Sequence, residues 1–338
     1  MNNRAISFLT VAVVLILMIG AISILFVRRG SLDSDTSDVL SFSGKDDILN
    51  MLILGRDSAA GLCDVIMLAS VNFAKNEVNV MQIPRDTYFN YTENDYKKIN
   101  GALNAYDSSA AFSRALEDAL GIDIDYYFTL RLDVVEKMVD AVSGIEIDVP
   151  VDMDYEDPSQ GLSIHLKAGK QSLDGKDAVQ FLRYRSGYVT GDLGRMDAQK
   201  LFINAFAKKL SEDKNPAVYY SLTRLLIKDA ETNFTEKDLV GLILKCKKDK
   251  PSSNYYMTAP GEAVQSEISG AWYYIVSRPA LYELIKDRFG SKYSENDFDK
   301  SNKLVDNRVK SFYDIYNKRS EYKIYSAIDA DNNLININ

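Results

Sequence analysis

Two kinds of hydrophobic pattern divide the chain. Residues 5–27 form an apolar run without a charge, which is long enough to cross a bilayer as a helix. A cleaved signal peptide is the alternative, but the run is longer than a typical signal core and no small-x-small cleavage site follows it. We therefore predict an uncleaved transmembrane helix at 5–27, followed by a Ser- and Asp-rich linker at 28–47. Arg4 on one side and Arg28 and Arg29 on the other leave the orientation open.

From Ile48 onward, strand patterns alternate with helix patterns. Buried or alternating apolar runs predict strands at 48–54, 65–71, 78–83, 126–130, 145–149, 162–166, 255–258 and 272–276. Apolar positions at helical spacing predict helices at 110–120, 133–142, 174–182, 193–210, 235–245 and 279–288, with Asp133 as one helix cap. This alternation indicates an α/β fold, a three-layer α-β-α sandwich with a central mixed sheet.

The apolar positions on the predicted helices are most simply interpreted as core residues. Six apolar positions recur at helical spacing, namely Phe112, Leu116, Leu120, Val135, Met138 and Val139. Some of them could instead line a slot for a lipid. Residues 291–338 are polar and form either a small appended element or a partly ordered tail.

Composition narrows the chemistry. Forty Lys and Arg against 48 Asp and Glu give a net charge of -8, the opposite of a general nucleic-acid binder. One His and two Cys leave no basis for His-based triads or for His and Cys metal cages. A bound metal would therefore have oxygen ligands, which points to Mg²⁺ or a similar hard cation. His165 and Cys63 are interpreted as structural residues.

Two carboxylates bracket a short loop after the first strand. Asp57 follows Gly55-Arg56, and Asp64 opens the next strand. Side chains at adjacent strand ends could share one cation. Water and substrate phosphates would complete the coordination shell of that cation. The alternative is ordinary solvated acids in a turn.

Arg85 and Asp86 follow Pro84, directly after the strand that ends at Ile83. Ligands of open α/β sheets gather at such strand ends, so Arg85 could bind a phosphate. The alternative is a local ion pair between Arg85 and Asp86.

The densest group of candidates lies further along the chain. Arg183 and Arg185 share a face if their segment is extended, and Arg195 and Gln199 share a face of the next helix. Guanidinium groups near the N-terminus of a helix suit phosphate oxygens. The alternative is a solvated face of ion pairs that includes Asp192.

These motifs together resemble the LytR-CpsA-Psr family of Gram-positive envelope proteins. The resemblance runs from about Ile48 to Gly290. The segments that carry it are Leu54-Gly55-Arg56-Asp57, Cys63-Asp64-Val65-Ile66-Met67-Leu68, Ile83-Pro84-Arg85-Asp86-Thr87, Lys98-Ile99-Asn100, Gly121-Ile122-Asp123-Ile124-Asp125-Tyr126-Tyr127, Val139-Asp140-Ala141-Val142-Ser143-Gly144-Ile145, Leu173-Asp174-Gly175-Lys176-Asp177-Ala178, Arg183-Tyr184-Arg185 and Asp192-Leu193-Gly194-Arg195 with Gln199.

The resemblance implies an extracellular catalytic domain at 48–290 on the membrane anchor, with residues 1–4 in the cytoplasm. It implies transfer of a phosphate-linked glycopolymer from an undecaprenyl-pyrophosphate carrier onto peptidoglycan. Asp57 and Asp64 match the family's metal ligands for Mg²⁺ or Mn²⁺. The matches to its pyrophosphate-binding residues are Arg85, Arg183, Arg185 and Arg195, with Gln199 alongside, and we add Lys98 as a substrate-binding residue.

Some positions depart from the family pattern. The usual Arg-Ser-Asp-Thr block reads Leu62-Cys63-Asp64-Val65, and the Arg-Gln-Gln block reads Ala198-Gln199-Lys200, so each loses an Arg. The metal geometry and the acceptor recognition that the resemblance implies therefore rest on fewer matching residues than the binding of the donor pyrophosphate.

The expected reaction is an in-line attack by a sugar hydroxyl of peptidoglycan on the pyrophosphate. Asp86 or Asp192 would accept the proton, and the sequence does not choose between them. Arg185→Ala and Arg195→Ala are each expected to abolish transfer without unfolding the protein. Two other readings remain open, namely a hydrolase of polyprenyl pyrophosphate and a noncatalytic module that binds glycopolymer.

Overall fold

The computed structural model of the protein describes residues 48–56, 61–92, 97–158, 162–184, 187, 198, 201–202, 205–206, 209–210, 212–213, 215–235, 238, 253–322, 324–328 and 334–336. The chain divides into two units. Unit 1 comprises Met1–Ser41 and Leu130–Lys248, and unit 2 comprises Phe42–Thr129 and Asp249–Asn338.

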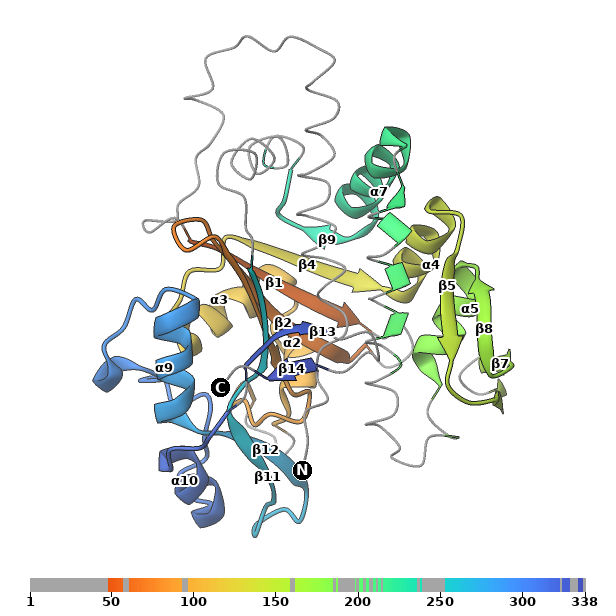
Figure 1. Cartoon of the computed structure of the whole chain (residues 1–338). Coiled ribbons are helices and arrows are strands. Elements are labelled where there is room, and N and C mark those ends of the chain that lie inside the picture. The colour runs from red at the N-terminus through yellow and green to blue at the C-terminus, as the bar shows by residue number, and fades with distance from the viewer. Residues whose placement is uncertain are drawn as a thin grey trace, which may run out of the picture. The chain divides into compact units, whose positions relative to one another are not determined.

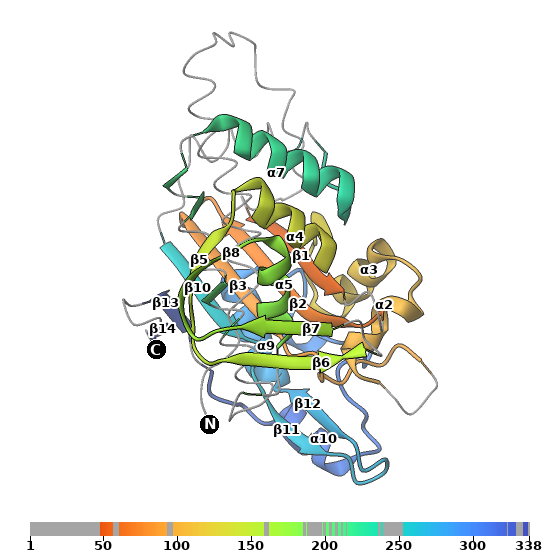
Figure 2. The same ribbon diagram turned by 90° about the vertical axis from the view of Figure 1, so that its right-hand side faces the viewer.

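A mixed sheet forms the centre of unit 2. Its strands follow the order β14-β13-β10-β3-β2-β1-β4 (Figures 1 and 2). Their bounds are β1 Ile48–Arg56, β2 Cys63–Asn72, β3 Glu77–Ile83, β4 Tyr126–Arg131, β10 Ser253–Thr258, β13 Ile324–Ile328 and β14 Leu334–Asn336. Strands β1, β2 and β3 are antiparallel neighbours, whereas β10 runs parallel to β3. The predicted mixed sheet is therefore confirmed.

One face of this sheet carries the core of unit 2. Alternate strand positions supply its apolar side chains, which are Leu52, Leu54, Ile66, Leu68, Met81, Ile83 and Met257. Helices α3 (Ser109–Leu120) and α9 (Arg278–Arg288) contribute to the same buried cluster through Phe112, Leu116, Leu281 and Ile285. The opposite face is also apolar and buried, as at Met51, Ile53 and Met67. The three-layer arrangement itself stays a prediction.

Helix α3 begins and ends where its sequence dictates. The Ser108 side chain accepts a hydrogen bond from the Ala111 N–H at 3.2 Å, which satisfies one of the free donors of the first turn. Gly121 ends the helix with φ 62°, and a Cβ at this position would lie 2.4 Å from Tyr293 Cδ2. Glycine is needed here for both conformation and space.

The residues after Gly290 belong to unit 2 and contribute to its core. Helix α10 (Lys310–Asn317) buries Phe312 and Tyr316 in the same cluster as α3 and α9. It lies beside the antiparallel hairpin of β11 (Gly261–Gln265) and β12 (Trp272–Val276) in both views (Figures 1 and 2). The short elements of this unit are η2 Ile99–Gly101, α2 Ala102–Ala105 and η4 Glu295–Asp297.

Unit 1 combines helices with two-stranded ribbons. Its helices are α4 Leu132–Ala141, α5 Gly175–Arg183 and α7 Pro216–Asp229. Strand β5 (Ile145–Val149) pairs with β8 (Gly169–Leu173), β6 (Met153–Asp157) pairs with β7 (Leu162–Leu166), and β9 (Glu231–Thr232) is short. Helices α4 and α5 pack so closely that position 175 has no room for a side chain. A Cβ on Gly175 would lie 2.2 Å from the Glu136 carbonyl oxygen.

The start of α4 differs from the prediction. Arg131, not Asp133, is the N-cap, and Asp133 lies in the first turn. The Arg131 guanidinium donates to both carboxylate oxygens of Asp133 at 2.9 Å, so this carboxylate is engaged by a cation instead of by the helix N–H groups. The prediction that Asp133 caps the helix was therefore wrong.

The predicted membrane helix at 5–27 and the linker at 28–47 lie outside the described residues. So does most of each predicted helix at 193–210 and 235–245. Among the residues that are described, no helix is both long and apolar enough to span a bilayer.

His165 holds two carboxylates on the outer surface of the β6–β7 ribbon. Its Nδ1 lies 2.8 Å from Asp154 Oδ1 and its Nε2 lies 2.6 Å from Glu156 Oε1. Hydrogen bonds to Glu156 and then to Asp154 raise the pKa of His165, because both partners favour the imidazolium. The interpretation of His165 as a structural residue agrees with this role.

We expect an NMR titration of His165, the single histidine of the chain, to give a pKa above that of a free histidine. The stabilisation is complete below the pKa of the unfolded chain and is lost as pH rises through the higher folded pKa. Glu156→Gln should move the titration back toward lower pH. A wild-type titration at the free-histidine value would contradict this assignment.

Candidate functional site

Asp64 and Arg85 meet at one edge of the sheet of unit 2. Asp64 is the second residue of β2, and Arg85 follows the end of β3 by two residues. Because these strands are antiparallel, with Ile66 opposite Ile83, the start of one lies beside the end of the other. Arg85 Nη1 donates to Asp64 Oδ1 at 2.9 Å, and the two side chains are 28% and 21% exposed. The site therefore places a half-buried cation and anion where β2 and β3 meet.

The loop that carries Arg85 is fixed by its backbone. The Thr87 N–H donates to the Pro84 carbonyl at 2.9 Å and closes a tight turn. The Arg85 carbonyl accepts from Asn100 N–H at 3.2 Å, and the Thr87 carbonyl accepts from Ile99 N–H at 2.8 Å. Thr87 is fully buried. These contacts hold the turn against η2 and limit the positions that the guanidinium can reach.

Asp86 forms an ion pair with Lys98, not with its neighbour Arg85. Lys98 Nζ donates to Asp86 Oδ1 at 2.8 Å and lies 5.9 Å from the centre of the Tyr273 ring. The Lys98 side chain is 18% exposed, whereas that of Asp86 is 44% exposed. The local Arg85–Asp86 pair considered from the sequence is thus replaced by two ion pairs that join separate segments.

Arg56 and Asn104 lie at the same edge, and their contact was not expected from the sequence. Arg56 is the last residue of β1 and stands opposite Cys63 in the register. Its Nη2 donates to Asn104 Oδ1 at 3.1 Å. A Cβ on Gly61, whose φ is +66°, would meet the Asn104 amide at 3.1 Å. The Gly55-Arg56-Asp57 segment marks this strand end in the sequence, but no sequence pattern indicates that Asn104 lies beside it.

Cys63 and the predicted core residues agree with their interpretations. Cys63 is fully buried, as expected of a structural thiol. All six apolar positions predicted for the core, namely Phe112, Leu116, Leu120, Val135, Met138 and Val139, are buried.

Arg183 is a candidate in unit 1. It is the last residue of α5, whose N-cap Asp174 accepts from the Asp177 N–H at 2.9 Å. Arg183 therefore ends a helix, so the extended segment that would place it on one face with Arg185 does not include this residue. The other predicted site residues lie outside the described part of the chain, namely Asp57, Arg185, Asp192, Arg195 and Gln199.

One predicted metal ligand can be tested for its fit. Asp64 offers carboxylate oxygens, the type of donor that Mg²⁺ prefers, and Arg85 occupies one of them. Within the described residues no cluster of three or more His, Cys, Asp or Glu could hold a metal. A Mg²⁺ ion uses one or two carboxylates together with water and phosphate oxygens, so Asp64 fits as one member of such a set.

The protein resembles known proteins along most of its length. The model of the LytR_cpsA_psr family matches residues 28–289. The polyisoprenyl-teichoic acid–peptidoglycan teichoic acid transferase TagU of Bacillus anthracis is 28% identical over 258 residues, which are 75% of this chain and 82% of the relative.

Solved structures share the fold. The crystal structure of Bacillus subtilis TagV aligns with a TM-score of 0.56 at 23% identity, over 72% of this chain and 96% of that chain. The structure of TagT bound to LI-WTA aligns with a TM-score of 0.53 at 21% identity, over 76% and 96% of the two chains. Because the family model covers well over half of the sequence, the chain belongs to the LytR-CpsA-Psr family.

Proposed function

We propose that the protein is a phosphotransferase that attaches an anionic or phosphate-linked glycopolymer to peptidoglycan, using a polyprenyl-pyrophosphate-linked donor. Family membership and the names of relatives such as TagU support this activity. The observation that carries the proposal is the Arg85–Asp64 pair, fixed by the turn at Pro84 where β2 and β3 meet. The predicted anchor at 5–27 would keep this domain at the outer face of the cell membrane, beside both substrates.

The donor brings a pyrophosphate whose charge must be neutralised before the bond can break. Arg85 is held in place before the substrate arrives, and its guanidinium can exchange the Asp64 carboxylate for phosphate oxygens with similar geometry. Arg183, Arg185, Arg195, Gln199 and Lys98 are proposed as further contacts to the donor. Preorganised cations of this kind stabilise the charge of a phosphoryl transition state.

Release of Asp64 from Arg85 would free a carboxylate for a cation. Asp64, with Asp57, would hold Mg²⁺, which would supply charge neutralisation at the pyrophosphate oxygens.

The reaction conserves atoms and charge without another reactant. A sugar hydroxyl of peptidoglycan attacks the phosphorus that is bonded to the glycopolymer, and a new P–O bond forms. The P–O bond to the lipid phosphate breaks, and lipid phosphate leaves. The hydroxyl proton passes to Asp86 or Asp192, one of which acts as base. Asp86 is exposed enough to reach a substrate while Lys98 keeps it in place.

The test uses the purified protein, Mg²⁺, a labelled glycan linked to lipid pyrophosphate, and peptidoglycan fragments. Label joined to peptidoglycan through a phosphodiester supports the transferase. Release of free phosphorylated glycan alone would instead identify a hydrolase. Binding without turnover would leave a noncatalytic module.

The metal can be tested without turnover. We expect Mg²⁺ to raise the melting temperature when a prenyl pyrophosphate is present, because a ligand that binds only the folded state stabilises it. Asp57→Ala and Asp64→Ala should each remove this shift. An equal shift in wild type and both variants would show that these carboxylates do not hold the ion.

A further inference from the structure

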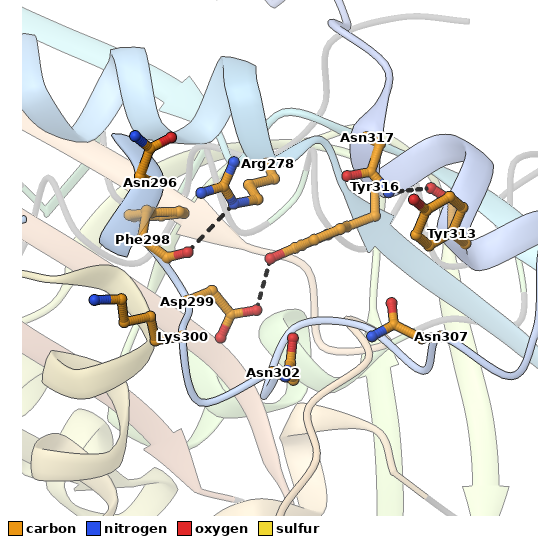
Figure 3. Close-up of a pocket in the computed structure, with 10 residues that line it drawn as sticks. All are labelled: Arg278, Asn296, Phe298, Asp299, Lys300, Asn302, Asn307, Tyr313, Tyr316 and Asn317. Carbon is orange, nitrogen blue, oxygen red and sulfur yellow. Dashed lines mark hydrogen bonds between the residues drawn. The ribbon is translucent and has the colours of Figure 1, made fainter. Parts of the chain in front are cut away.

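A cavity lies among residues 278–317 of unit 2, and the residues that line it include none of Asp64, Arg85, Asp86 and Lys98. Its volume is about 280 Å³. Most residues that line it follow residue 289, where the match to the family model ends. Figure 3 shows that α9, the segment 296–307 and α10 each present side chains to it.

The segment between α9 and α10 is held rigidly by a buried carboxylate. Asp299 is 2% exposed and accepts from the Tyr316 hydroxyl at 2.7 Å, from Lys303 N–H at 2.9 Å and from Leu304 N–H at 3.2 Å. Asp299 and Asn302 adopt positive φ angles of 52° and 49°. Such a tightly bonded segment presents its side chains in a fixed arrangement before any ligand arrives.

The side chains that face the cavity are rich in amides and phenol groups. Asn296, Asn302 and Asn307 come from the fixed segment, and all three are exposed. Each amide carries both donors and an acceptor, so it can bind a hydroxyl or an acetamido group in either sense. The Tyr313 ring, 51% exposed, adds an apolar surface and a hydroxyl.

The two cations at the cavity already have anionic or carbonyl partners. Arg278 donates from Nε to the Phe298 carbonyl at 3.2 Å, and its Nη2 donates to the Glu295 carbonyl. Lys300 forms an ion pair with Asp297. With both cations engaged and a carboxylate also lining the cavity, the site favours an uncharged polar ligand over a phosphate.

From this arrangement we infer that the cavity binds one or two saccharide units, a compact ligand with several hydroxyl or acetamido groups. Its volume is slightly below the roughly 300–1,000 Å³ of sites for drug-sized molecules, which suits a small sugar and not a prenyl chain. The choice of a saccharide among hydroxyl-bearing ligands rests on the proposed function, in which donor and acceptor are both glycans. The cavity would then hold a sugar of one substrate through residues other than Asp64 and Arg85.

The experiment measures binding of sugars to the full chain by saturation-transfer NMR. The protein is kept in a detergent without a sugar headgroup, and neither Mg²⁺ nor a lipid donor is added. The probes are N,N′-diacetylchitobiose and cellobiose, which have the same linkage and differ in their acetamido groups. We expect at least one to bind, and the stronger of the two identifies whether acetamido or hydroxyl groups are preferred.

The test variant is Asn307→Ala/Tyr313→Ala, whose two positions are exposed, so that folding should be retained. We expect its affinity for the bound sugar to fall at least tenfold. Tyr220→Ala is the matched control, since Tyr220 is an exposed tyrosine on α7, outside the cavity. A circular dichroism spectrum and a melting temperature equal to wild type establish that the double variant is folded.

Absence of binding by both sugars at millimolar concentration would overturn the inference, as would equal affinity in wild type and the folded double variant. Its failure is distinguishable from failure of the proposed function, because binding is measured without a donor. If the protein transfers glycan but binds neither sugar, only the inference about this cavity is wrong. If the protein binds sugar through Asn307 and Tyr313 but transfers nothing, the inference about the cavity holds and the proposed transferase activity is wrong.

Discussion

Replacing Arg85 with alanine is expected to lower the rate of glycopolymer transfer by roughly 10²–10³-fold, the typical cost of removing one preorganised donor from a transition state. Arg85 is held by the turn at Pro84 and by Asp64, so its guanidinium is in position before the donor binds. Arg85→Lys keeps the charge but loses the planar fork, and we expect it to recover only part of the rate. Initial rates with a labelled lipid-pyrophosphate donor measure both variants.

Arg288, the last residue of α9, provides a matched control at the other end of β3. Its guanidinium pairs with Glu77 at 3.2 Å, at the opposite end of β3, and the two side chains are 16% and 18% exposed. Arg288→Ala therefore removes a similarly buried ion pair at a site away from the proposed chemistry. We expect it to reduce stability but to leave the rate per folded molecule unchanged. Similar losses of rate in Arg85→Ala and Arg288→Ala would show that the effect is structural.

Long or strongly patterned elements were predictable from the sequence, because burial fixes their periodicity. The predicted strands at 48–54, 65–71 and 78–83 correspond to β1, β2 and β3 within two residues at each end. Helix α7 was missed, although Asn215 caps it and Pro216 stands at its first turn. Its apolar residues do not form a clear stripe, so these end signals were the only guide.

The candidate site was predictable in its residue types but not in its pairing. Candidates at the ends of β2 and β3 follow from the strand pattern, and their antiparallel order places them together. Which acid meets which base depends on the turn geometry, and the structure joins Asp64 to Arg85 and Asp86 to Lys98. The cavity beside α10 could not be predicted from the sequence. Its Asn residues are scattered through a polar segment whose composition is typical of a tail.

The core of unit 2 extends into that polar segment. Phe312 and Tyr316 of α10 belong to the same cluster as Phe112 of α3, although about 200 residues separate them along the chain. Phe112 itself is fully buried, at 6.1 Å between ring centres from both Phe89 and Tyr106. The site loop at 84–87 and the cavity therefore depend on a single core.

Phe112→Ala is expected to lower the free energy of unfolding of unit 2 by about 3–5 kcal/mol, because it leaves a cavity lined by rings that cannot close over it. The measurement is urea unfolding followed by circular dichroism and by fluorescence of Trp272, the single tryptophan of the chain, which lies in unit 2. Tyr313→Ala is the control in the same unit, since that ring is half exposed, and it should change the free energy by less than about 1 kcal/mol. A loss below about 1 kcal/mol for Phe112→Ala would contradict the packing of α3 on the sheet. A large loss for Tyr313→Ala would mean that α10 stabilises unit 2 through its exposed face as well as through Phe312 and Tyr316.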